Sequence, residues 1–587
     1  MFVGCTAVFK RLLVANRGEI AVRVMRACSD IGIETVAIYS DLDVSAVHTG
    51  YADQALNVGP GPATESYLNI PAILEAARRS GATAVHPGYG FLAENGDFAQ
   101  AVIDAGLVWV GPQPEVMRTM GDKTAARAAA ADAGVATVPG TAGPVTGTDE
   151  VLSFAAEHGL PVAIKASAGG GGKGFRVVGE EAEIEEALAG AAREAQAYFS
   201  SPHVYVERYL ERPRHIEVQV LGDASGAVLS FPERDCSLQR RHQKLVEESP
   251  SPALEPGVRE AIMEAAARVS KQVGYRNAGT CEFLLDTDGT TFYFLEMNTR
   301  LQVEHPVTEL ATGIDLVNAQ LLIAAGEPLG FSQDDIALKA HAIECRINAE
   351  DPEKSFMPAP GTVAAYHEPS GPGVRVDSGL ESNATIPQAY DPMVAKVITY
   401  GAGRDEARRR MLRALAEYKI EGVKTTIPFH RLMLADERFV TGDYHTGTVE
   451  REMDLGELAE TSAPQPKAGE PETVLRDFEV ELGGKRFAVR VRERLDSTVM
   501  PKKPKPPKKA GAVAGGAGET LIAPMQGTIV NILVTEGQEV EAGDTICVLE
   551  AMKMENSILA HTGGVVEKVN VTAGQAVDTG AAIATIK

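Results

Sequence analysis

The sequence lacks the features that mark secreted and membrane-spanning proteins. No apolar run approaches the ~20 residues that a transmembrane helix needs, so we expect no membrane partner. The apolar N-terminal residues are followed, not preceded, by Lys10 and Arg11, which is the reverse of a signal peptide. The six cysteines form no CxxC pair and have no metal-like spacing, which favours a reducing cytoplasm; they are at positions 5, 28, 236, 281, 345 and 547.

Positive charge is also scarce in this chain. There are 56 Lys and Arg residues against 80 Asp and Glu residues, for a formal net charge of −24. This balance argues against nucleic acid as the main partner. The length of 587 residues suggests about four domains of ~150 residues each. Hydrophobic residues make up 44% of the chain, which is enough for several cores.

An internal repeat occupies the C-terminal part of the chain. Seven residues recur 37 positions later: Gly527, Val534, Thr535, Gly537, Gln538, Val540 and Gly543 return as Gly564, Val571, Thr572, Gly574, Gln575, Val577 and Gly580. We expect two copies of a strand–turn–strand unit that pack face to face, because neither copy buries its apolar side alone. Lys553 falls between the copies, where a tight turn would display its amine.

With Met552-Lys553-Met554 at its centre and Ala523-Pro524-Met525 upstream, this repeat resembles a biotinyl carrier domain. Lipoyl domains have a similar repeat and lysine but lack the flanking methionines. The resemblance implies that Lys553 carries covalent biotin, attached by a biotin protein ligase.

The N-terminal residues alternate strand-like and helix-like patterns. Residues 11–15 and 35–39 are buried-strand patterns, and a helix through Ile20, Val24 and Met25 lies between them. Such alternation predicts an open parallel α/β sheet. The turn at residues 16–18 is not GxGxxG, so a dinucleotide site has little support. The Gly/Pro-rich loop 86–92 is equally a turn or part of a site.

A glycine run follows the strand-like residues around Lys165. Gly169 to Gly172 leave backbone N–H groups free to close over phosphate oxygens, and Lys165 and Lys173 flank them. A P-loop is absent because glycine follows Lys173 where Ser or Thr would be required. The alternative interpretation is a flexible hairpin tip.

Cations are concentrated at residues 234–244, between apolar strands, which favours an anion site over a solvated face. Two further strands carry carboxylates at Glu282 and Glu296. Glu296 and Asn298 are two apart and would face the same side of a strand. Such oxygen ligands suit Mg²⁺ on nucleotide phosphates; the alternative is that they are exposed edge residues.

Arg300 and Gln302 follow at once, and both are donors suited to a small planar anion. Glu304 beside them is an acceptor that could serve as a base.

Further along, Phe478, Val480 and Leu482 alternate with charged residues before a Gly-Gly turn, which predicts a β-hairpin. Residues 501–509 form a stiff Lys/Pro segment of roughly 28 Å at ~3.1 Å per residue.

From residue 10 to about 455 the chain resembles biotin carboxylases of the ATP-grasp superfamily. The resemblance implies an ATP site made of Lys123, Lys165, Glu207, Leu210, His215, Gln239 and His242, closed by a lid of Gly169, Gly170, Gly171 and Gly172. It implies that Mg²⁺ or Mn²⁺ is bound by Glu282, Glu296 and Asn298. Bicarbonate would be cradled by Lys244, Arg300, Gln302 and Val303.

The same resemblance assigns the reacting groups. Glu304 would remove the bicarbonate proton, Arg346 would steady the deprotonated ureido oxygen of biotin, and Tyr89 would lie near the biotin. ATP would phosphorylate bicarbonate to carboxyphosphate, which then carboxylates biotin on Lys553.

The expected fold is multidomain α/β: a biotin carboxylase with an ATP-grasp fold, a linker region with a β-hairpin, and a C-terminal all-β biotinyl (lipoyl-like) domain. The expected boundaries are 9–122 for the N-terminal α/β domain, 123–335 for the ATP-grasp domain, 336–455 for the C-terminal carboxylase domain, 456–519 for the linker and carboxyltransferase-docking region, and 520–587 for the biotinyl carrier domain.

This layout resembles the alpha subunits of actinobacterial acetyl- and propionyl-CoA carboxylases. It implies a carboxyltransferase on a separate beta subunit, together with a homo-oligomeric arrangement within a larger complex. The alternative is the corresponding subunit of a methylcrotonyl-CoA, pyruvate or other carboxylase. A carrier protein with a dead ATP-grasp part is disfavoured by five intact residues: Lys165, Glu282, Glu296, Arg300 and Glu304.

Overall fold

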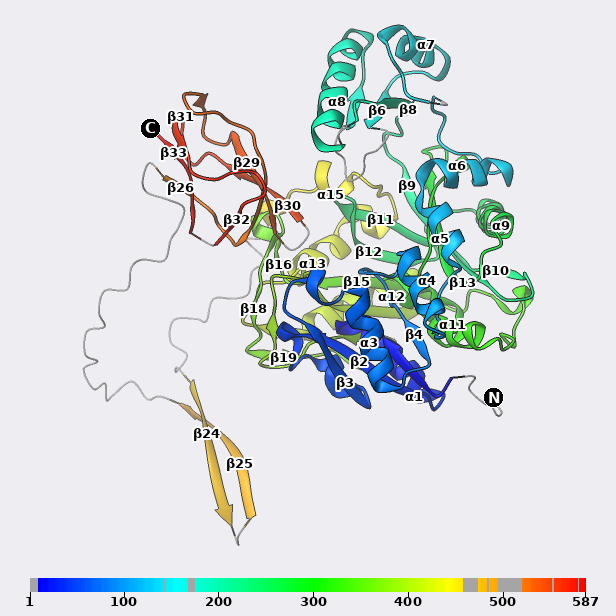
Figure 1. The fold of residues 1–587 in the computed structure, drawn as a ribbon, viewed down its shortest axis with the longest axis vertical. Helices are drawn as coiled ribbons and strands as arrows, with labels where there is room; N and C mark the ends of the chain where they lie inside the picture. The colour runs from blue at the N-terminus through cyan, green and yellow to red at the C-terminus, as the bar shows by residue number, and fades with distance from the viewer. Residues whose placement is uncertain are drawn as a thin grey trace. The chain divides into compact units, whose positions relative to one another are not determined.

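The computed structural model describes residues 9–141, 143–166, 175–199, 201–457, 473–482, 485–494, 520–551, 554–578 and 580–587. The chain divides into two compact units, Met1–Leu455 and Gly456–Lys587 (Figure 1). The predicted glycine lid, Gly169 to Gly172, and the predicted biotin-bearing Lys553 lie outside the described residues.

The first unit begins with the predicted parallel sheet. Its five strands are all parallel, in the order β3-β2-β1-β4-β5. The helix through Ile20, Val24 and Met25 is α1, which buries all three side chains. The elements are β1 (Arg11–Val14), α1 (Gly18–Asp30), β2 (Glu34–Ser40), α2 (Val47–Tyr51), β3 (Gln54–Gly59), α3 (Ile70–Ser80), β4 (Ala84–His86), α4 (Gly96–Asp104) and β5 (Val108–Trp109).

A small α/β subdomain contains the strand that precedes the glycine run. Its three-stranded sheet has the order β7-β6-β8, and its core includes Val151, Ile164, Ala191 and Val206. The elements are α7 (Thr148–His158), β6 (Val162–Ala166), β7 (Phe175–Val178), α8 (Ile184–Phe199) and β8 (Val204–Arg208).

A nine-stranded sheet forms the centre of the first unit, with the main order β14-β13-β9-β11-β12-β15-β22-β20 and β10 paired to β9 (Figure 1). The sheet runs without a break across the expected boundary at 335/336. The strands are β9 (Arg214–Gly222), β10 (Val228–Ser230), β11 (Arg234–Arg240), β12 (Gln243–Ser249), β13 (Asn277–Leu285), β14 (Phe292–Asn298), β15 (His341–Asn348), β20 (Val374–Ser378) and β22 (Met393–Gly401).

Helices and short strands surround this sheet. The helices are α5 (Pro114–Gly121), α6 (Lys123–Asp132), α9 (Pro256–Gln272), α10 (His305–Thr312), α11 (Leu316–Ala325), α12 (Arg404–Glu417), α13 (Ile427–Ala435), α14 (Glu437–Thr441) and α15 (Thr448–Arg451). The short strands are β16 (Glu350–Asp351), β17 (Met357–Pro358), β18 (Gly361–Thr362), β19 (Ala365–His367), β21 (Thr385–Ile386) and β23 (Lys419–Glu421).

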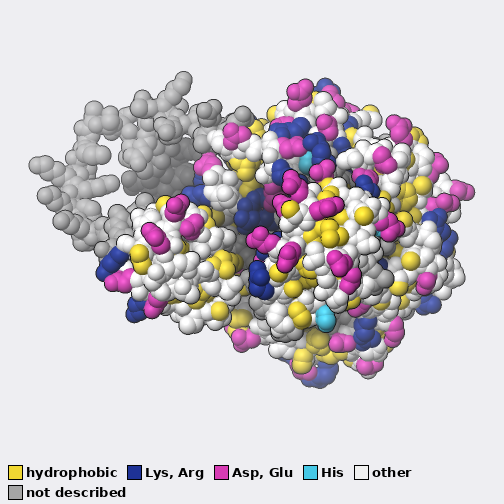
Figure 2. All heavy atoms as spheres, turned by 90° about the horizontal axis from the view of Figure 1, so that it is seen from above, with side chains coloured by type: hydrophobic (Ala, Val, Ile, Leu, Met, Phe, Trp, Pro, Cys, Tyr) yellow, Lys and Arg dark blue, Asp and Glu magenta, His cyan; other side chains and the backbone are white. Residues whose placement is uncertain are grey.

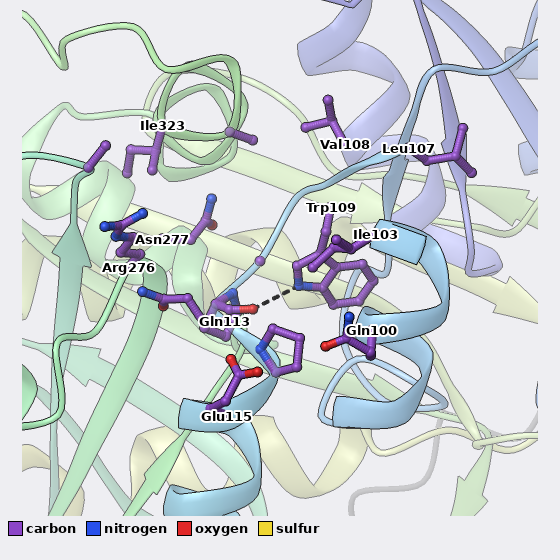
Figure 3. A pocket seen from close by; sticks show the side chains of 15 residues that line it. Gln100, Ile103, Leu107, Val108, Trp109, Gln113, Glu115, Arg276, Asn277 and Ile323 are labelled. Carbon is purple, nitrogen blue, oxygen red and sulfur yellow. Dashed lines mark hydrogen bonds between the residues drawn. The ribbon is translucent and has the colours of Figure 1, made fainter. Parts of the chain in front are cut away.

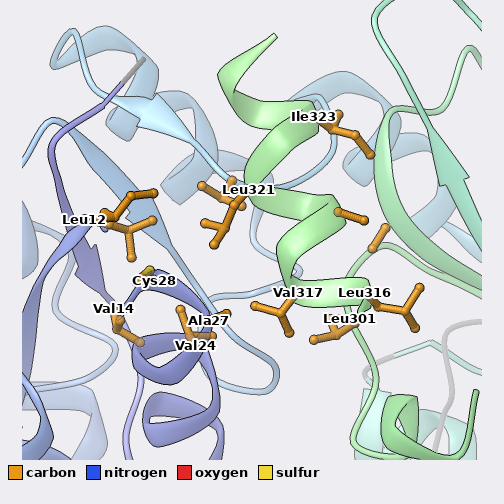
Figure 4. Close-up of a cluster of buried hydrophobic side chains, with 14 of the residues drawn as sticks. Leu12, Val14, Val24, Ala27, Cys28, Leu301, Leu316, Val317, Leu321 and Ile323 are labelled. Atoms are coloured by element: carbon orange, nitrogen blue, oxygen red, sulfur yellow. The ribbon is translucent and has the colours of Figure 1, made fainter. Parts of the chain in front are cut away.

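One hydrophobic core joins the N-terminal sheet to α11 and to the loop before α10. Leu12 on β1 and Val24 on α1 lie in the same buried cluster as Val317 and Leu321 on α11 (Figure 4). Leu301, in the loop that carries the predicted bicarbonate residues, belongs to this cluster and is fully buried. The core therefore anchors that loop.

None of the described helices is, by itself, long and apolar enough to cross a membrane; only α10 and α11 taken together pass that test, and they are bent by 96°. Acidic and basic side chains are mixed over the face that Figure 2 shows.

The second unit contains the predicted hairpin and the repeat module. β24 (Thr473–Leu482) pairs with β25 (Lys485–Arg494), with Phe478 opposite Val489 and Val480 opposite Phe487. The backbone register therefore confirms the predicted hairpin and its alternating apolar positions.

The repeat is visible in the strands of the module. β27, β28 and β29 begin at Gly527, Glu539 and Thr545, and β31, β32 and β33 begin 37 residues later, at Gly564, Ala576 and Ala582. The bounds are β26 (Thr520–Ile522), β27 (Gly527–Ile532), β28 (Glu539–Val540), β29 (Thr545–Ala551), β30 (Met554–Leu559), β31 (Gly564–Val569), β32 (Ala576–Val577) and β33 (Ala582–Ile586).

The copies do not form two separate halves that pack face to face, as the repeat alone predicts. The two four-stranded sheets have the orders β26-β33-β31-β28 and β30-β29-β27-β32, so each sheet takes strands from both copies. The glycines that open the copies explain part of the repeat: a Cβ on Gly527 would lie 2.4 Å from the carbonyl oxygen of Glu550, and one on Gly564 would lie 2.3 Å from that of Lys587. At both positions a neighbouring backbone leaves no room for a side chain, so each copy needs glycine there.

Candidate active site

The predicted site residues lie along the central sheet on neighbouring strands. Glu296 on β14 is opposite Glu282 on β13, Glu282 is opposite Glu217 on β9, and Glu217 is opposite Arg234 on β11. Three carboxylates in one row repel one another unless cations lie between them. The register therefore creates a site that requires positive charge.

Lys244 on β12 supplies part of that charge. Its Nζ contacts Glu217 closely and lies 3.1 Å from Oε1 of Glu282 and 2.8 Å from Oε1 of Glu304. Burial lowers the pKa of Lys244, but Glu217, Glu282 and Glu304 raise it by a larger amount. The net shift is upward, which keeps the amine charged.

Glu304 is held between two cations. Its second oxygen, Oε2, accepts a hydrogen bond of 2.9 Å from Nη2 of Arg346, whose Nε donates to Glu247 at 2.6 Å. Burial raises the pKa of Glu304, but Lys244 and Arg346 lower it well below its usual value. The residue is 1% exposed, so the structure provides a carboxylate in a site shielded from water, and its lowered pKa favours the ionised form.

Glu282 binds donors at both oxygens. Its Oε2 accepts from Nε2 of His215 at 2.8 Å, and its Oε1 accepts from Gln302 at 3.0 Å and from Asn298 at 3.2 Å. Burial raises the pKa of Glu282, but Lys244 and His215 lower it by a larger amount. The net shift is downward, which favours the ionised carboxylate.

Glu296, Glu282 and Asn298 fit a divalent cation. Burial and the neighbouring Glu282 carboxylate raise the pKa of Glu296, which is the expected result of two like charges forced together. A hard cation between them would relieve that repulsion, and carboxylate and amide oxygens are its preferred ligands. The structure brings all three residues together, as their positions on the two strands predict.

Arg300 and Gln302 lie beside this group. Arg300 donates from Nη2 to Oδ1 of Asn298 at 2.8 Å and from Nε to Glu94 at 3.0 Å. Gln302 is 1% exposed and bridges Glu282 and Arg234.

Val303 and Tyr89 meet at Lys396. The carbonyl oxygen of Val303 accepts from Nζ of Lys396 at 2.8 Å, and that amine lies 5.6 Å from the centroid of the Tyr89 ring. The Tyr89 hydroxyl is buried and has no hydrogen-bond partner within the described part of the chain. Loop 86–92 therefore supplies a side chain near the bicarbonate residues predicted from the sequence.

The residues predicted to surround ATP are spread over several elements. Lys165 on β6 pairs with Glu207 on β8, and Leu210 packs with Val138 and Tyr293. Lys123 is exposed at the start of α6, and its charge offsets part of the rise in the pKa of Glu296.

Strain marks the turn between β11 and β12. Gln239 is opposite Lys244 and Arg240 is opposite Gln243, so Arg241 and His242 form the turn. Both have positive φ, 48° and 62°, a conformation that hairpin turns normally give to Asn or Gly. Strained non-glycine backbone of this kind is concentrated at functional sites.

Sequence reasoning missed three charged residues of the site. Arg234 is fully buried and donates to Glu217, Gln219, Thr280, Gln302 and Thr308. Glu217 is fully buried against Lys244, and Glu247 binds Arg346. Arg234 opens the cation-rich run and Glu217 follows His215 by two residues, so strand alternation could have placed Glu217 on the same face.

A separate pocket of about 520 Å³ lies between α4, β5, α5 and α11 (Figure 3). Trp109, Gln113, Arg276 and Ile323 line it, and none of the site residues predicted from the sequence is among its lining residues.

Four family descriptions match successive parts of the chain. "Biotin carboxylase, N-terminal domain" matches residues 8–117, "Carbamoyl-phosphate synthase L chain, ATP binding domain" matches 122–332, "Biotin carboxylase C-terminal domain" matches 344–451, and "Biotin-requiring enzyme" matches 519–586.

Similar proteins agree with these matches. A biotin-dependent acyl-coenzyme A carboxylase alpha3 subunit of Mycobacterium leprae is 49% identical over 591 residues, which is 98% of both chains. Biotin carboxylase 1 of Bacillus subtilis is 51% identical over 441 residues, 75% of this chain and 98% of that protein.

Solved structures show the same fold for the first unit. A Campylobacter jejuni biotin carboxylase, crystallised in a β,γ-ATP complex, has a TM-score of 0.71 and 44% identity, covering 76% of this chain and 99% of that one. The biotin carboxylase domain of Hydrogenobacter thermophilus 2-oxoglutarate carboxylase, crystallised with MgADP, ADP and bicarbonate, has a TM-score of 0.71 and 46% identity, covering 77% and 98%.

The chain combines an ATP-dependent biotin carboxylase with a biotinyl domain. The match to the Mycobacterium leprae protein covers 98% of this chain and so extends through both units. The chain therefore belongs to the family of biotin-dependent acyl-CoA carboxylase alpha subunits.

Proposed function

We propose that this chain carboxylates its own biotin at the expense of ATP and bicarbonate. It then supplies the carboxyl group to a carboxyltransferase beta subunit, which transfers it to acetyl-CoA or propionyl-CoA. The observation that carries the carboxylase step is the Glu304 carboxylate, held between Lys244 and Arg346 beside Glu282, Glu296 and Asn298, whose oxygens suit a metal.

The proposed roles combine what the family resemblance implies with charge and position in the structure. Arg300, Gln302, Lys244 and the backbone of Val303 hold bicarbonate, and Glu304 accepts its proton. Arg300 suits this task because its guanidinium has five N–H donors and only part of them are taken by Glu94, Asn298 and the carbonyl oxygen of Leu301. Arg346 holds the ureido oxygen of biotin, and Tyr89 lines the space for the ring.

The nucleotide is held by a second set of residues. Positioning and charge neutralisation dominate phosphoryl transfer, so the main contribution of the protein is to place cationic and hydrogen-bonding groups around the phosphates. The proposed ATP residues are Lys123, Lys165, Glu207, Leu210, His215, Gln239, His242 and the lid Gly169 to Gly172.

Two groups complete the proposed site. Mg²⁺ or Mn²⁺, held by Glu282, Glu296 and Asn298, would neutralise the phosphate charge of ATP. Biotin on Lys553 would supply the ureido nitrogen that carries the carboxyl group between active sites.

The proposed domains keep the boundaries 9–122, 123–335, 336–455, 456–519 and 520–587. We also propose a cytoplasmic location, modification by a biotin protein ligase, and a homo-oligomeric arrangement within the larger complex. The five cysteines in the described part of the chain are unpaired thiols, as expected in a reducing compartment.

The proposed acyl acceptor is acetyl-CoA or propionyl-CoA. The layout with a Lys/Pro segment at 501–509 supports an acetyl- or propionyl-CoA carboxylase. Pyruvate is the competing acceptor, because a pyruvate carboxylase subunit of Methanothermobacter thermautotrophicus is 52% identical over 442 residues. The test is to purify the chain with its native partner and measure transfer of labelled bicarbonate to acetyl-CoA, propionyl-CoA, methylcrotonyl-CoA and pyruvate. Preferred labelling of methylcrotonyl-CoA or pyruvate would contradict the assignment.

We propose that the β24–β25 hairpin belongs to the docking element for the carboxyltransferase. An isolated hairpin is marginal in water, and its alternating apolar positions need a surface to cover. A flexible linker of equal length in place of residues 472–496 should abolish co-elution with the partner and reduce acyl-CoA carboxylation sharply. Biotinylation of Lys553 and carboxylation of free biotin should be unaffected. A complex of unchanged affinity would rule the docking role out.

A further inference from the structure

Lys396 is a buried cation that none of the assigned roles uses. It lies on β22, and its side chain is 0% exposed. Its Nζ donates to the carbonyl oxygen of Val303 at 2.8 Å and lies 3.2 Å from Oε1 of Glu19 on α1. The same amine is 5.6 Å from the centroid of the Tyr89 ring.

Three parts of the first unit meet at this amine. Glu19 belongs to α1 of the N-terminal sheet, and Val303 belongs to the loop before α10. On the central sheet, Lys396 is opposite Arg346 on β15 and Asp377 on β20. A buried lysine is costly, and it is tolerated only where its charge and its donors are satisfied.

The bond to Val303 fixes a particular peptide. The carbonyl of Val303 and the N–H of Glu304 belong to the same planar unit, so holding the oxygen sets the direction in which Glu304 leaves the loop. Two other contacts fix the preceding residues: Leu301 is fully buried, and the carbonyl of Gln302 accepts from Nδ1 of His305 at 2.7 Å. Lys396 completes this support at the residue next to the carboxylate.

We propose that Lys396 is a positioning residue for the carboxylation of biotin: it orients the Val303–Glu304 peptide through its hydrogen bond to the Val303 carbonyl oxygen. This inference rests on the proposed roles of Val303 and Glu304 in bicarbonate binding. The amine acts through the backbone of the loop, by its bond to the Val303 carbonyl oxygen.

The test uses the full biotinylated chain and measures ATP cleavage against bicarbonate concentration, with free biotin present. The double variant Lys396→Met/Glu19→Gln removes the donor to Val303 together with the carboxylate that lies 3.2 Å from it. We expect kcat/KM for bicarbonate to fall about 100-fold, the size of effect that a misplaced reacting group produces. The KM for ATP should stay within about twofold, because the lysine amine binds Val303 and Glu19 rather than the described residues assigned to ATP.

Glu19→Gln is the matched control. It removes the ion pair and keeps the hydrogen bond to Val303, so kcat/KM for bicarbonate should stay within about threefold of wild type. An equal loss in Glu19→Gln and in the double variant would overturn the proposal, as would a double variant with wild-type kinetics. Lys396→Arg retains a cationic donor and should recover at least about tenfold of the loss; a folded Lys396→Arg protein without recovery also counts against it.

Glu304→Gln, measured in parallel, distinguishes a failure of the Lys396 role from a failure of the proposed bicarbonate site. A slow Glu304→Gln enzyme together with a normal double variant would refute only the role of Lys396. A Glu304→Gln enzyme of normal rate would refute the proposed site itself.

Discussion

Replacing Glu304 by Gln tests the centre of the site. The change keeps the shape of the side chain but replaces one carboxylate oxygen by an NH₂ group. In the wild-type protein both oxygens of Glu304 accept hydrogen bonds from cations, Oε1 from Lys244 at 2.8 Å and Oε2 from Arg346 at 2.9 Å. Whichever way the amide turns, its NH₂ meets one of these donors.

The cost has two parts. Removing one partner of a buried ion pair destabilises a protein by about 3–5 kcal/mol, because the remaining charges lose their counter-ion. Removing a positioned base lowers the rate by about 10²–10⁴-fold, which is about 2.7–5.5 kcal/mol in the activation barrier. We therefore expect a Glu304→Gln protein that is less stable than wild type, binds MgATP, and cleaves it at least about 100-fold more slowly with biotin present.

Glu309→Gln separates the two parts. Glu309 lies on α10, is 6% exposed, and accepts from Arg23 at 2.9 Å and from Arg375 at 2.7 Å. Its replacement breaks comparable buried pairs away from the reacting groups, so the melting temperature should fall while kcat stays near wild type. A Glu304→Gln enzyme with near-normal turnover, or a Glu309→Gln enzyme as slow as Glu304→Gln, would refute the reasoning.

Three further results are expected. An intact-mass spectrum should show one biotinyl adduct that is lost in Lys553→Ala, and an adduct that survives would move the attachment elsewhere. Hydrogen exchange over residues 168–174 should slow on adding MgATP, because four consecutive glycines give up conformational freedom when they order over phosphate; unchanged exchange would count against a lid. Burial raises the pKa of Glu248, but hydrogen bonds from His341 and Arg404 lower it to about 2. This network should therefore contribute about 3 kcal/mol above the unfolded pKa of ~4.5, and lose it as the pH falls towards 2; the melting-temperature difference between wild type and Glu248→Gln should shrink over that range, and a constant difference would contradict the linkage.

Local patterns in the sequence predicted the parts of the site that lie on one strand. Glu296 and Asn298 are two residues apart, and β14 (Phe292–Asn298) has the bounds that the apolar pattern predicts. The 37-residue repeat likewise predicted paired strands, because each copy carries its own turns and apolar positions.

The rest of the site depends on which strands are neighbours, and alternation along the chain does not contain that information. Glu217 and Arg234 are ordinary alternating residues until β9 and β11 pair and bury both. Lys396 becomes part of the site only because β22 follows β15 in the sheet. The interleaved strands of the repeat module were missed for the same reason: internal similarity gives the strands but not their order.

The unbroken central sheet limits how this chain can be divided and inherited. Arg346 and Lys396 come from strands beyond residue 335, and β15 covers the edge of β12 that carries Glu247. A chain cut at 335 would expose a strand edge that carries buried charges. It would also lose the hydrogen bonds from Arg346 to Glu304 and from Lys396 to the Val303 carbonyl oxygen. We therefore expect the carboxylase to be exchangeable between proteins only as one piece, and biotin carboxylase 1 of Bacillus subtilis, 98% of which is covered, matches 441 residues of this chain. The described strands of the repeat module pair only among themselves, so we expect gene fusion to add or remove this module without breaking the central sheet.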